Sequence, residues 1–173
     1  CRTKAIVPVH FTGRLCDMDA IRDISQKNDL LVIEDSAQAM GAKAAAMEFS
    51  AGSVGDVAAF SFNPMKVFPG YGEAGAVVTD DPKIDRRLRA LRYLGTERTN
   101  LCVEVSLNSK MDEIQAAMLL TGFDSFDDVV GDAGNTKTMF TQASSGDYAS
   151  NNYKIQCAAN AAKTIYTWTV TFT

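Results

Sequence analysis

The stretches LLVIED at residues 30–35 and VAAFSF at residues 57–62 decide the fold of this chain. Each is a short apolar run of the length of a buried strand, and polar or turn residues bound it on both sides. The first run ends in two acids, Glu34 and Asp35. Because functional residues of open α/β sheets lie at the carboxyl ends of strands, we expect these acids to face solvent or a ligand.

Strand-like runs and helical periodicity alternate around these two stretches, which is typical of an α/β fold. Asp17 precedes one helical pattern, and Asp81 with Pro82 precedes another; both are good helix starts. Ser109 with Asp112 resembles a capping box that opens a third helix. The pattern predicts strands at 5–9, 30–35, 57–62 and 75–79, helices at 17–27, from 81 and in DEIQAAMLL at 112–120, and a late strand in TIYTWTVTF.

Composition places the 173 residues among soluble globular proteins, with 46% hydrophobic and 22% charged residues. No apolar run approaches the roughly 18 residues of a membrane span, so we expect no membrane partner. Residues 1–110 hold 14 basic and 14 acidic residues, and residues 111–173 hold three basic and seven acidic residues. This balance predicts no nucleic-acid partner, and a solvated surface is the expected role of the basic run at 83–92.

The cysteines are scattered, at positions 1, 16, 102 and 157, and only His10 could join them at a metal. No metal site is therefore expected, and reduced thiols predict a cytoplasmic protein. The chain opens on Cys1 and not on Met, which suggests a piece of a longer protein.

GYGEAG at 70–75 matches the GxGxxG pattern of dinucleotide-binding loops. That pattern works only where it follows a strand directly and opens a helix. Here a proline-containing loop precedes it and a predicted strand follows. We therefore expect these glycines to let a tight loop turn close to another part of the chain.

Asp35 and Lys66 are the residues with most chemical potential. Asp35 ends a predicted strand, and Lys66 lies between Met65 and Val67 in the loop after the next strand. A lysine in apolar surroundings loses its proton more readily, as a Schiff-base nucleophile requires. A surface lysine and a strand-end aspartate fit the same pattern, so spacing leaves both interpretations open.

Four segments, in order, resemble the sugar aminotransferase family DegT/DnrJ/EryC1/StrS. They are LLVIEDSAQAMGA at 30–42, GSVGDVAAFSFNPMKVFPGYGEAGAVVT at 52–79, LRYLGT at 91–96 and SLNSKMDEIQAAML at 106–119. The resemblance implies a pyridoxal 5′-phosphate (PLP) enzyme of the aspartate aminotransferase fold type. On this basis residues 1–120 are part of a three-layer α/β large domain with a mostly parallel central sheet and flanking helices. Residues 121–173 would be a divergent helix and strand leading towards a truncated small domain.

The resemblance also implies roles for five residues. Lys66 matches the lysine that forms a Schiff base with the cofactor, and Asp35 matches the aspartate that pairs with the pyridine nitrogen. Gln38 matches a position near the phenolic oxygen, and Ser61 matches a phosphate-binding hydroxyl. Asn108 matches the asparagine that reaches the phosphate of the neighbouring subunit.

The implied activity is transfer of an amino group from an amino acid such as glutamate to a nucleotide-linked keto sugar, as in polysaccharide biosynthesis, by a homodimer. Lys110 stands where an arginine is common. Family members are more than twice as long, so we expect outer strands and most of the small domain to be missing. The alternative is that the chain is a truncated non-catalytic α/β module or assembly partner derived from the family.

Overall fold

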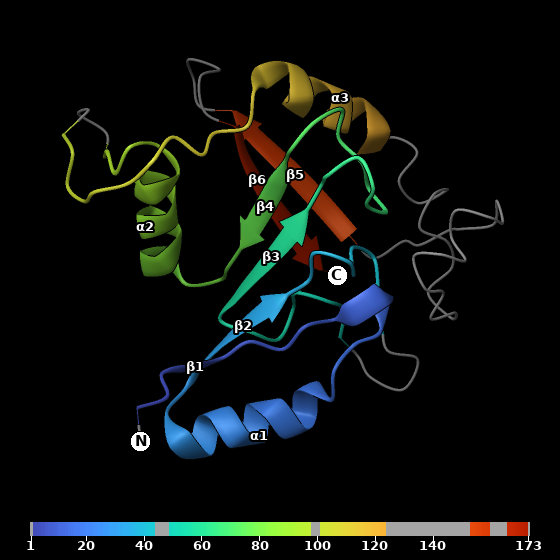
Figure 1. The fold of residues 1–173 in the computed structure, drawn as a ribbon, viewed down its shortest axis with the longest axis vertical. Coiled ribbons are helices and arrows are strands. Elements are labelled where there is room, and N and C mark those ends of the chain that lie inside the picture. The colour runs from blue at the N-terminus through green and yellow to red at the C-terminus, as the bar shows by residue number, and fades with distance from the viewer. Residues whose placement is uncertain (1, 44–48, 98–100, 124–152, 160–165, 173) are drawn as a thin grey trace, which may run out of the picture.

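The structure, a computed structural model, describes residues 2–43, 49–97, 101–123, 153–159 and 166–172 (Figure 1). A four-stranded sheet lies at its centre in the order β1-β2-β3-β4. The first three strands are parallel, and β4 runs antiparallel to β3. The strands are β1 (Ala5–Ile6), β2 (Leu31–Asp35), β3 (Val57–Ser61) and β4 (Gly75–Val78). The predicted α/β fold with a mostly parallel sheet and flanking helices is confirmed.

Helices α1 (Met18–Asn28) and α2 (Pro82–Arg92) begin at the predicted caps. The Asp17 carboxylate accepts a hydrogen bond from Ala20 N, and the Asp81 carboxylate accepts from Lys83 N. These bonds satisfy backbone donors that the first helical turn leaves unpaired. In Figure 1, α1 lies below the sheet and α3 above it.

Helix α3 (Glu113–Phe123) begins four residues later than the predicted capping box at Ser109. Ser109 N donates to Arg92 O, at the end of α2, and is therefore not available to the Asp112 side chain, as a capping box requires. The predicted helix, DEIQAAMLL at 112–120, is present, but Ser109 N does not make the capping-box bond.

A separate two-stranded antiparallel ribbon joins β5 (Tyr153–Ala159) to β6 (Tyr166–Phe172). The late strand predicted in TIYTWTVTF corresponds to β6. The sequence patterns did not reveal β5, whose run YKIQCAA alternates weakly.

The two faces of the central sheet differ in burial. Side chains alternate between faces along a strand, so Val32 and Glu34 of β2 lie on the same face as Ala58 and Phe60 of β3. All four are buried. Around this face the core also includes Met40, Phe62, Phe68 and Leu119 of α3. The opposite face, with Ile33, Asp35, Ala59 and Ser61, is half-buried.

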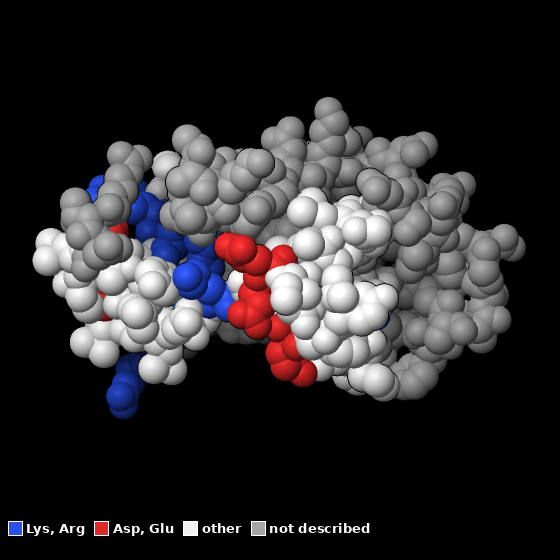
Figure 2. All heavy atoms as spheres, turned by 90° about the horizontal axis from the view of Figure 1, so that it is seen from above, with Lys and Arg blue, Asp and Glu red and all other residues white. Residues whose placement is uncertain are grey.

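Charged side chains of both signs lie next to one another on the surface. Figure 2 shows Lys and Arg gathered on one side of the face it presents, with a band of Asp and Glu directly beside them. On α2, Arg86 pairs with Glu97 at 2.9 Å, and Arg87 pairs with Glu104. The expected solvated face is present at Lys83, Arg86 and Arg87, which are exposed, whereas Arg89 and Arg92 of the same run are half-buried. Within the described ranges, no helix is long and apolar enough to span a membrane.

Candidate functional site

Asp35 and Ser61 end neighbouring parallel strands and point to the same face of the sheet. Asp35 pairs with Ala59, and Ser61 lies two residues further along β3, so the alternation of side chains returns it to that face. Both residues are half-buried. The Asp35 carboxylate accepts a hydrogen bond from Ala37 N at 3.1 Å. A carboxylate and a hydroxyl thus share one edge and one accessible face.

Gln38 follows in the loop after β2, and its amide has a defined orientation. Its Oε1 accepts from Thr12 N at 3.0 Å. Because a backbone N–H only donates, the oxygen must face Thr12, and the two N–H donors of Gln38 remain available on the other side. Gln38 therefore supplies donors at the same edge of the sheet.

Lys66 lies in the loop that joins β3 to β4, on a tight turn. Its backbone N donates to Asn63 O at 2.8 Å. The side chain of Lys66 is half-buried, Phe68 is 3% exposed and Met65 is 80% exposed. The apolar surroundings expected from the sequence are thus present on one side of Lys66, where Val67 and Phe68 join the core, and absent at Met65.

The GYGEAG segment closes the same loop and runs into β4, not into a helix. The Gln115 side chain of α3 lies against it: Gln115 Oε1 accepts from Tyr71 N at 2.9 Å. A Cβ at Gly72 would overlap with Gln115 Nε2. The glycine here permits a close approach of the loop to α3, as the sequence led us to expect.

Asn108 lies away from these residues, in the segment between α2 and α3. It forms an isolated bridge with Tyr93, and its Oδ1 accepts from Lys110 N at 3.2 Å. Lys110 Nζ lies 3.9 Å from the centre of the Tyr93 ring, within the range of a cation–π contact. Asn108 and Lys110 are both exposed.

Glu34 does not face solvent or a ligand, so this part of the sequence expectation was wrong. It is 0% exposed, and its Oε2 accepts from His10 Nε2 at 2.8 Å. His10 Nδ1 in turn accepts from Cys16 N, so that nitrogen carries no proton and Nε2 carries the one donated to Glu34. His10, considered for a metal site, is a neutral partner of a buried carboxylate.

The Glu34 carboxylate also accepts from the backbone N–H groups of Gly52, Val54 and Gly55, at 2.7, 2.8 and 2.5 Å. Burial raises the pKa of Glu34, but the hydrogen bonds from His10 and the three backbone groups outweigh burial and hold the pKa below its ordinary value. The burial of Glu34 could have been expected from the sequence, because alternation along a strand places Glu34 on the same face as the apolar Val32. Among the described residues, no group of His, Cys, Asp and Glu could hold a metal ion.

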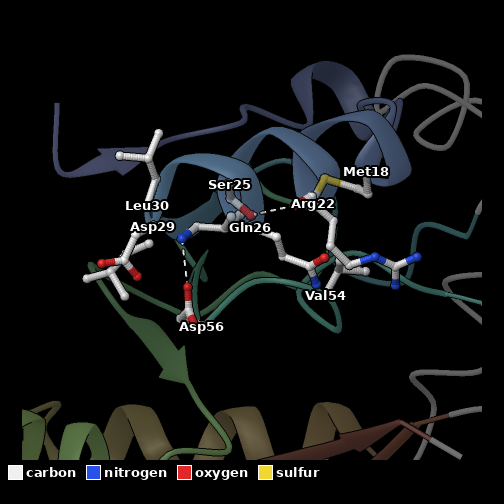
Figure 3. A pocket seen from close by; sticks show the side chains of 10 residues that line it. Met18, Arg22, Ser25, Gln26, Asp29, Leu30, Val54 and Asp56 are labelled. Carbon is white, nitrogen blue, oxygen red and sulfur yellow. Dashed lines mark hydrogen bonds between the residues drawn. The ribbon is translucent and has the colours of Figure 1, made fainter. Parts of the chain in front are cut away.

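A cavity of about 350 Å³ lies at the other end of β2 (Figure 3). Arg22 and Gln26 of α1, Val32 and Asp56 are among its lining residues, and Asp56 Oδ2 accepts from Val32 N at 2.7 Å. None of the five predicted site residues lines it. It is a separate feature from the carboxyl edge of the sheet.

The donor set at the carboxyl edge suits a particular kind of ligand. Lys66 supplies a primary amine, Asp35 an acceptor for a protonated nitrogen, and Gln38 and Ser61 neutral donors. Ser61 Oγ accepts from Asn63 N at 3.3 Å, which leaves its own proton to be donated. These groups fit an aldehyde carried on a phosphorylated nitrogen heterocycle, since a lysine amine condenses with carbonyl carbons.

Comparison with known families matches the chain to the DegT/DnrJ/EryC1/StrS aminotransferase family over residues 1–146. A relative from Micromonospora megalomicea subsp. nigra, a dTDP-3-amino-3,4,6-trideoxy-alpha-D-glucose transaminase, is 46% identical over 129 residues, which are 72% of this chain and 34% of the relative. A UDP-N-acetyl-3-dehydro-alpha-D-glucosamine 3-aminotransferase from Acidithiobacillus ferrooxidans is 44% identical, over 70% of this chain and 32% of the relative.

Solved structures agree with this match. An aminotransferase of the same family name from Brucella abortus has a TM-score of 0.66 at 36% identity, covering 72% of this chain and 33% of its own. DesV from S. venezuelae, in complex with a ketimine intermediate, has a TM-score of 0.66 at 43% identity. The match covers 73% of this chain and 33% of DesV. The chain spans about a third of the length of the curated relatives it matches.

Proposed function

Because the chain belongs to the DegT/DnrJ/EryC1/StrS aminotransferase family, we propose that it is the cofactor-binding part of a PLP-dependent aminotransferase. The reaction moves an amino group from an amino acid such as glutamate to a nucleotide-linked keto sugar. The observation that carries this proposal is that β2 and β3 have Asp35 and Ser61 on one face at their carboxyl ends, with Gln38 and Lys66 in the loops that follow these strands. The names of the relatives, which act on dTDP- and UDP-linked sugars, support the substrate class.

Each residue of the edge has a role in this proposal. Asp35 keeps a proton on the ring nitrogen of the cofactor, Gln38 donates to its phenolic oxygen, and Ser61 donates to its phosphate. Lys66 holds the cofactor covalently. When bound, PLP supplies an electron sink for the negative charge that develops at the α carbon of the amino acid.

The chain's own part in the chemistry is proton transfer by Lys66. When not bonded to the cofactor, Lys66 Nζ would be a free amine. As a base it takes the proton from the α carbon of the donor, and as an acid it returns that proton later in the exchange. The same group carries out the reverse steps with the keto sugar.

A trapping experiment tests the proposal. The chain is incubated with PLP, reduced with sodium borohydride, digested and mapped by mass spectrometry. We expect a stable pyridoxyl adduct on Lys66, with none in the Lys66→Ala variant, because borohydride fixes the bond between a lysine and an aldehyde. An adduct spread over surface lysines, or none at all, would favour a non-catalytic α/β module or assembly partner.

A homodimer is also part of the proposal, and an exposed apolar row supports it. Alternate residues of the segment before Asn108 face outward, while the residues between them are tied to α2 and the segment after it: Cys102 Sγ donates to Leu94 O, and Glu104 pairs with Arg87. The outward residues are Leu101, Val103, Val105 and Leu107, exposed by 64%, 51%, 96% and 79%. Such a row next to a predicted cross-subunit residue fits the surface of a second copy.

Val105→Asp is expected to weaken self-association by about 10-fold to 100-fold, since burial of a valine side chain contributes about 1.5–3 kcal/mol. Sedimentation velocity over a range of concentrations measures this. Val7→Asp is the matched control, because Val7 is also exposed, at 57%, and lies before β2. Equal dissociation constants for the two variants would remove the row from the interface.

Two further assignments are proposed on the same basis. The five site residues all lie within residues 1–120, which fits a large-domain part there and a divergent connection towards a small domain at 121–173. Cys16 and Cys102 are free thiols, in keeping with a reducing, cytoplasmic setting.

A further inference from the structure

Asn63 makes four hydrogen bonds within the loop that carries Lys66. Its backbone N donates to Ser61 Oγ at 3.3 Å, and its backbone O accepts from Lys66 N at 2.8 Å. Its side-chain Oδ1 accepts from Met65 N at 2.9 Å, and its Nδ2 donates to Glu73 Oε1 at 2.7 Å. One residue is thus bonded to both Ser61 and the turn of Lys66.

The orientation of the Asn63 amide follows from its partners. A backbone N–H only donates and an ionised carboxylate only accepts, so Oδ1 must face Met65 and Nδ2 must face Glu73. The Oδ1 bond closes a turn of the kind that asparagine favours. The Nδ2 bond ties that turn to the returning arm of the loop, just before β4. Without the bond to Glu73, the Asn63 side chain would bond only to Met65 N, within its own turn, and not to the other arm of the loop.

We propose that Asn63, held by Glu73, is a positioning residue that sets the Ser61 hydroxyl and the Lys66 amine relative to each other. The catalytic meaning of this inference rests on the proposed function, in which Ser61 would contact the phosphate and Lys66 the aldehyde of one cofactor, two groups on adjacent ring carbons. Asn63 N occupies a lone pair of Ser61 Oγ and so directs the hydroxyl proton elsewhere, while Asn63 O fixes the backbone from which Lys66 extends. A shift of this turn changes both contacts together.

Exchanging the donor and the acceptor of the Asn63–Glu73 hydrogen bond tests this contact. Asn63→Asp keeps the acceptor for Met65 N but places a second carboxylate against Glu73. The double variant Asn63→Asp/Glu73→Gln supplies an amide donor from position 73 and restores the contact with donor and acceptor exchanged. We expect the single variant to bind PLP about threefold to tenfold more weakly than the original chain and the double variant to recover most of that loss.

A second readout does not depend on the cofactor. Hydrogen exchange of the peptide that contains Met65 and Lys66, measured by mass spectrometry on the chain without PLP, should quicken in Asn63→Asp and slow again in the double variant. Asn28→Asp is the matched control: Asn28 ends α1, its Nδ2 donates to Ile24 O, and it lies outside the loop. The PLP affinity and the hydrogen exchange of Asn28→Asp should both match those of the original chain.

The outcomes separate the inference from the proposed function. If the original chain forms the adduct on Lys66 and Asn63→Asp matches it in both affinity and exchange, the inference is wrong and the function stands. If the double variant remains as impaired as the single one, the contact with Glu73 is not what positions the turn. If PLP does not bind but exchange follows the predicted order, the proposed function fails while the positioning by Asn63 is upheld.

Discussion

Replacing Lys66 with alanine is expected to slow amino-group transfer by about 10²–10⁴-fold, the usual contribution of a positioned acid–base group. In the proposed reaction Lys66 both holds the cofactor and moves the proton of the α carbon, and alanine does neither. Stopped-flow absorbance with glutamate and PLP measures the first half of the exchange. A small added amine, such as methylamine, should restore part of the rate, because it replaces the missing base without the missing tether.

Lys83→Ala is the control for this experiment. Lys83 is an exposed residue in the first turn of α2, so its loss removes one positive charge and leaves the edge of the sheet unchanged. We expect the rate of this variant to match that of the original chain. A Lys66→Ala protein that transfers amino groups at the original rate would show that another amine performs the reaction.

Glu34→Gln is expected to lower the free energy of unfolding by about 3–5 kcal/mol, a large share of the stability of one domain. Gln has one acceptor oxygen where Glu34 offers two, and its NH₂ group would oppose N–H donors that now point at the carboxylate. Urea denaturation followed by circular dichroism measures the change. Asp19→Asn removes an exposed carboxylate paired with Arg22 and should change stability by less than about 1 kcal/mol.

The same carboxylate predicts a dependence of stability on pH. The pKa of Glu34 is held below its ordinary value of 4.5 in the folded chain. Its contribution is therefore complete above pH 4.5 and is lost as the pH falls through the lower, folded pKa. In Glu34→Gln this part of the acid sensitivity should be absent, so the two proteins should converge in stability at low pH. Parallel curves down to strong acid would exclude Glu34 as the titrating group.

The sequence predicted the four central strands because each is a local apolar run, although β1 covers only Ala5–Ile6 of the predicted 5–9. It predicted the starts of α1 and α2 for the same reason, since Asp17 and Asp81 cap residues within three positions of themselves. The capping box at Ser109 was predicted wrongly because the bond between Ser109 N and Arg92 O depends on tertiary structure. Local capping patterns do not reveal a competitor that lies far away in the chain.

In the candidate site, too, local sequence predicted some features, and others depended on tertiary structure. Lys66, Asp35 and Ser61 were found from motifs, but the common face of Asp35 and Ser61 required the register of β2 against β3. The burial of Glu34 was missed because two adjacent acids at a strand end look alike in sequence, although alternation sends them to opposite faces. The role of Asn63 depends on a partner beyond the turn, at Glu73, that no periodic pattern marks.

The pairing of Ser61 with Gly75 has a consequence for how the chain folds. The β3–β4 hairpin closes a short loop, so Ser61, Asn63, Lys66 and Glu73 can assemble as one local unit. Asp35 joins them only when β2 aligns in parallel with β3, and its pairing with Ala59 spans 24 positions where Ser61 and Gly75 span 14, which costs somewhat more loop-closure entropy. The amine should therefore be in place before its carboxylate counterpart, and parallel strand pairing completes the site.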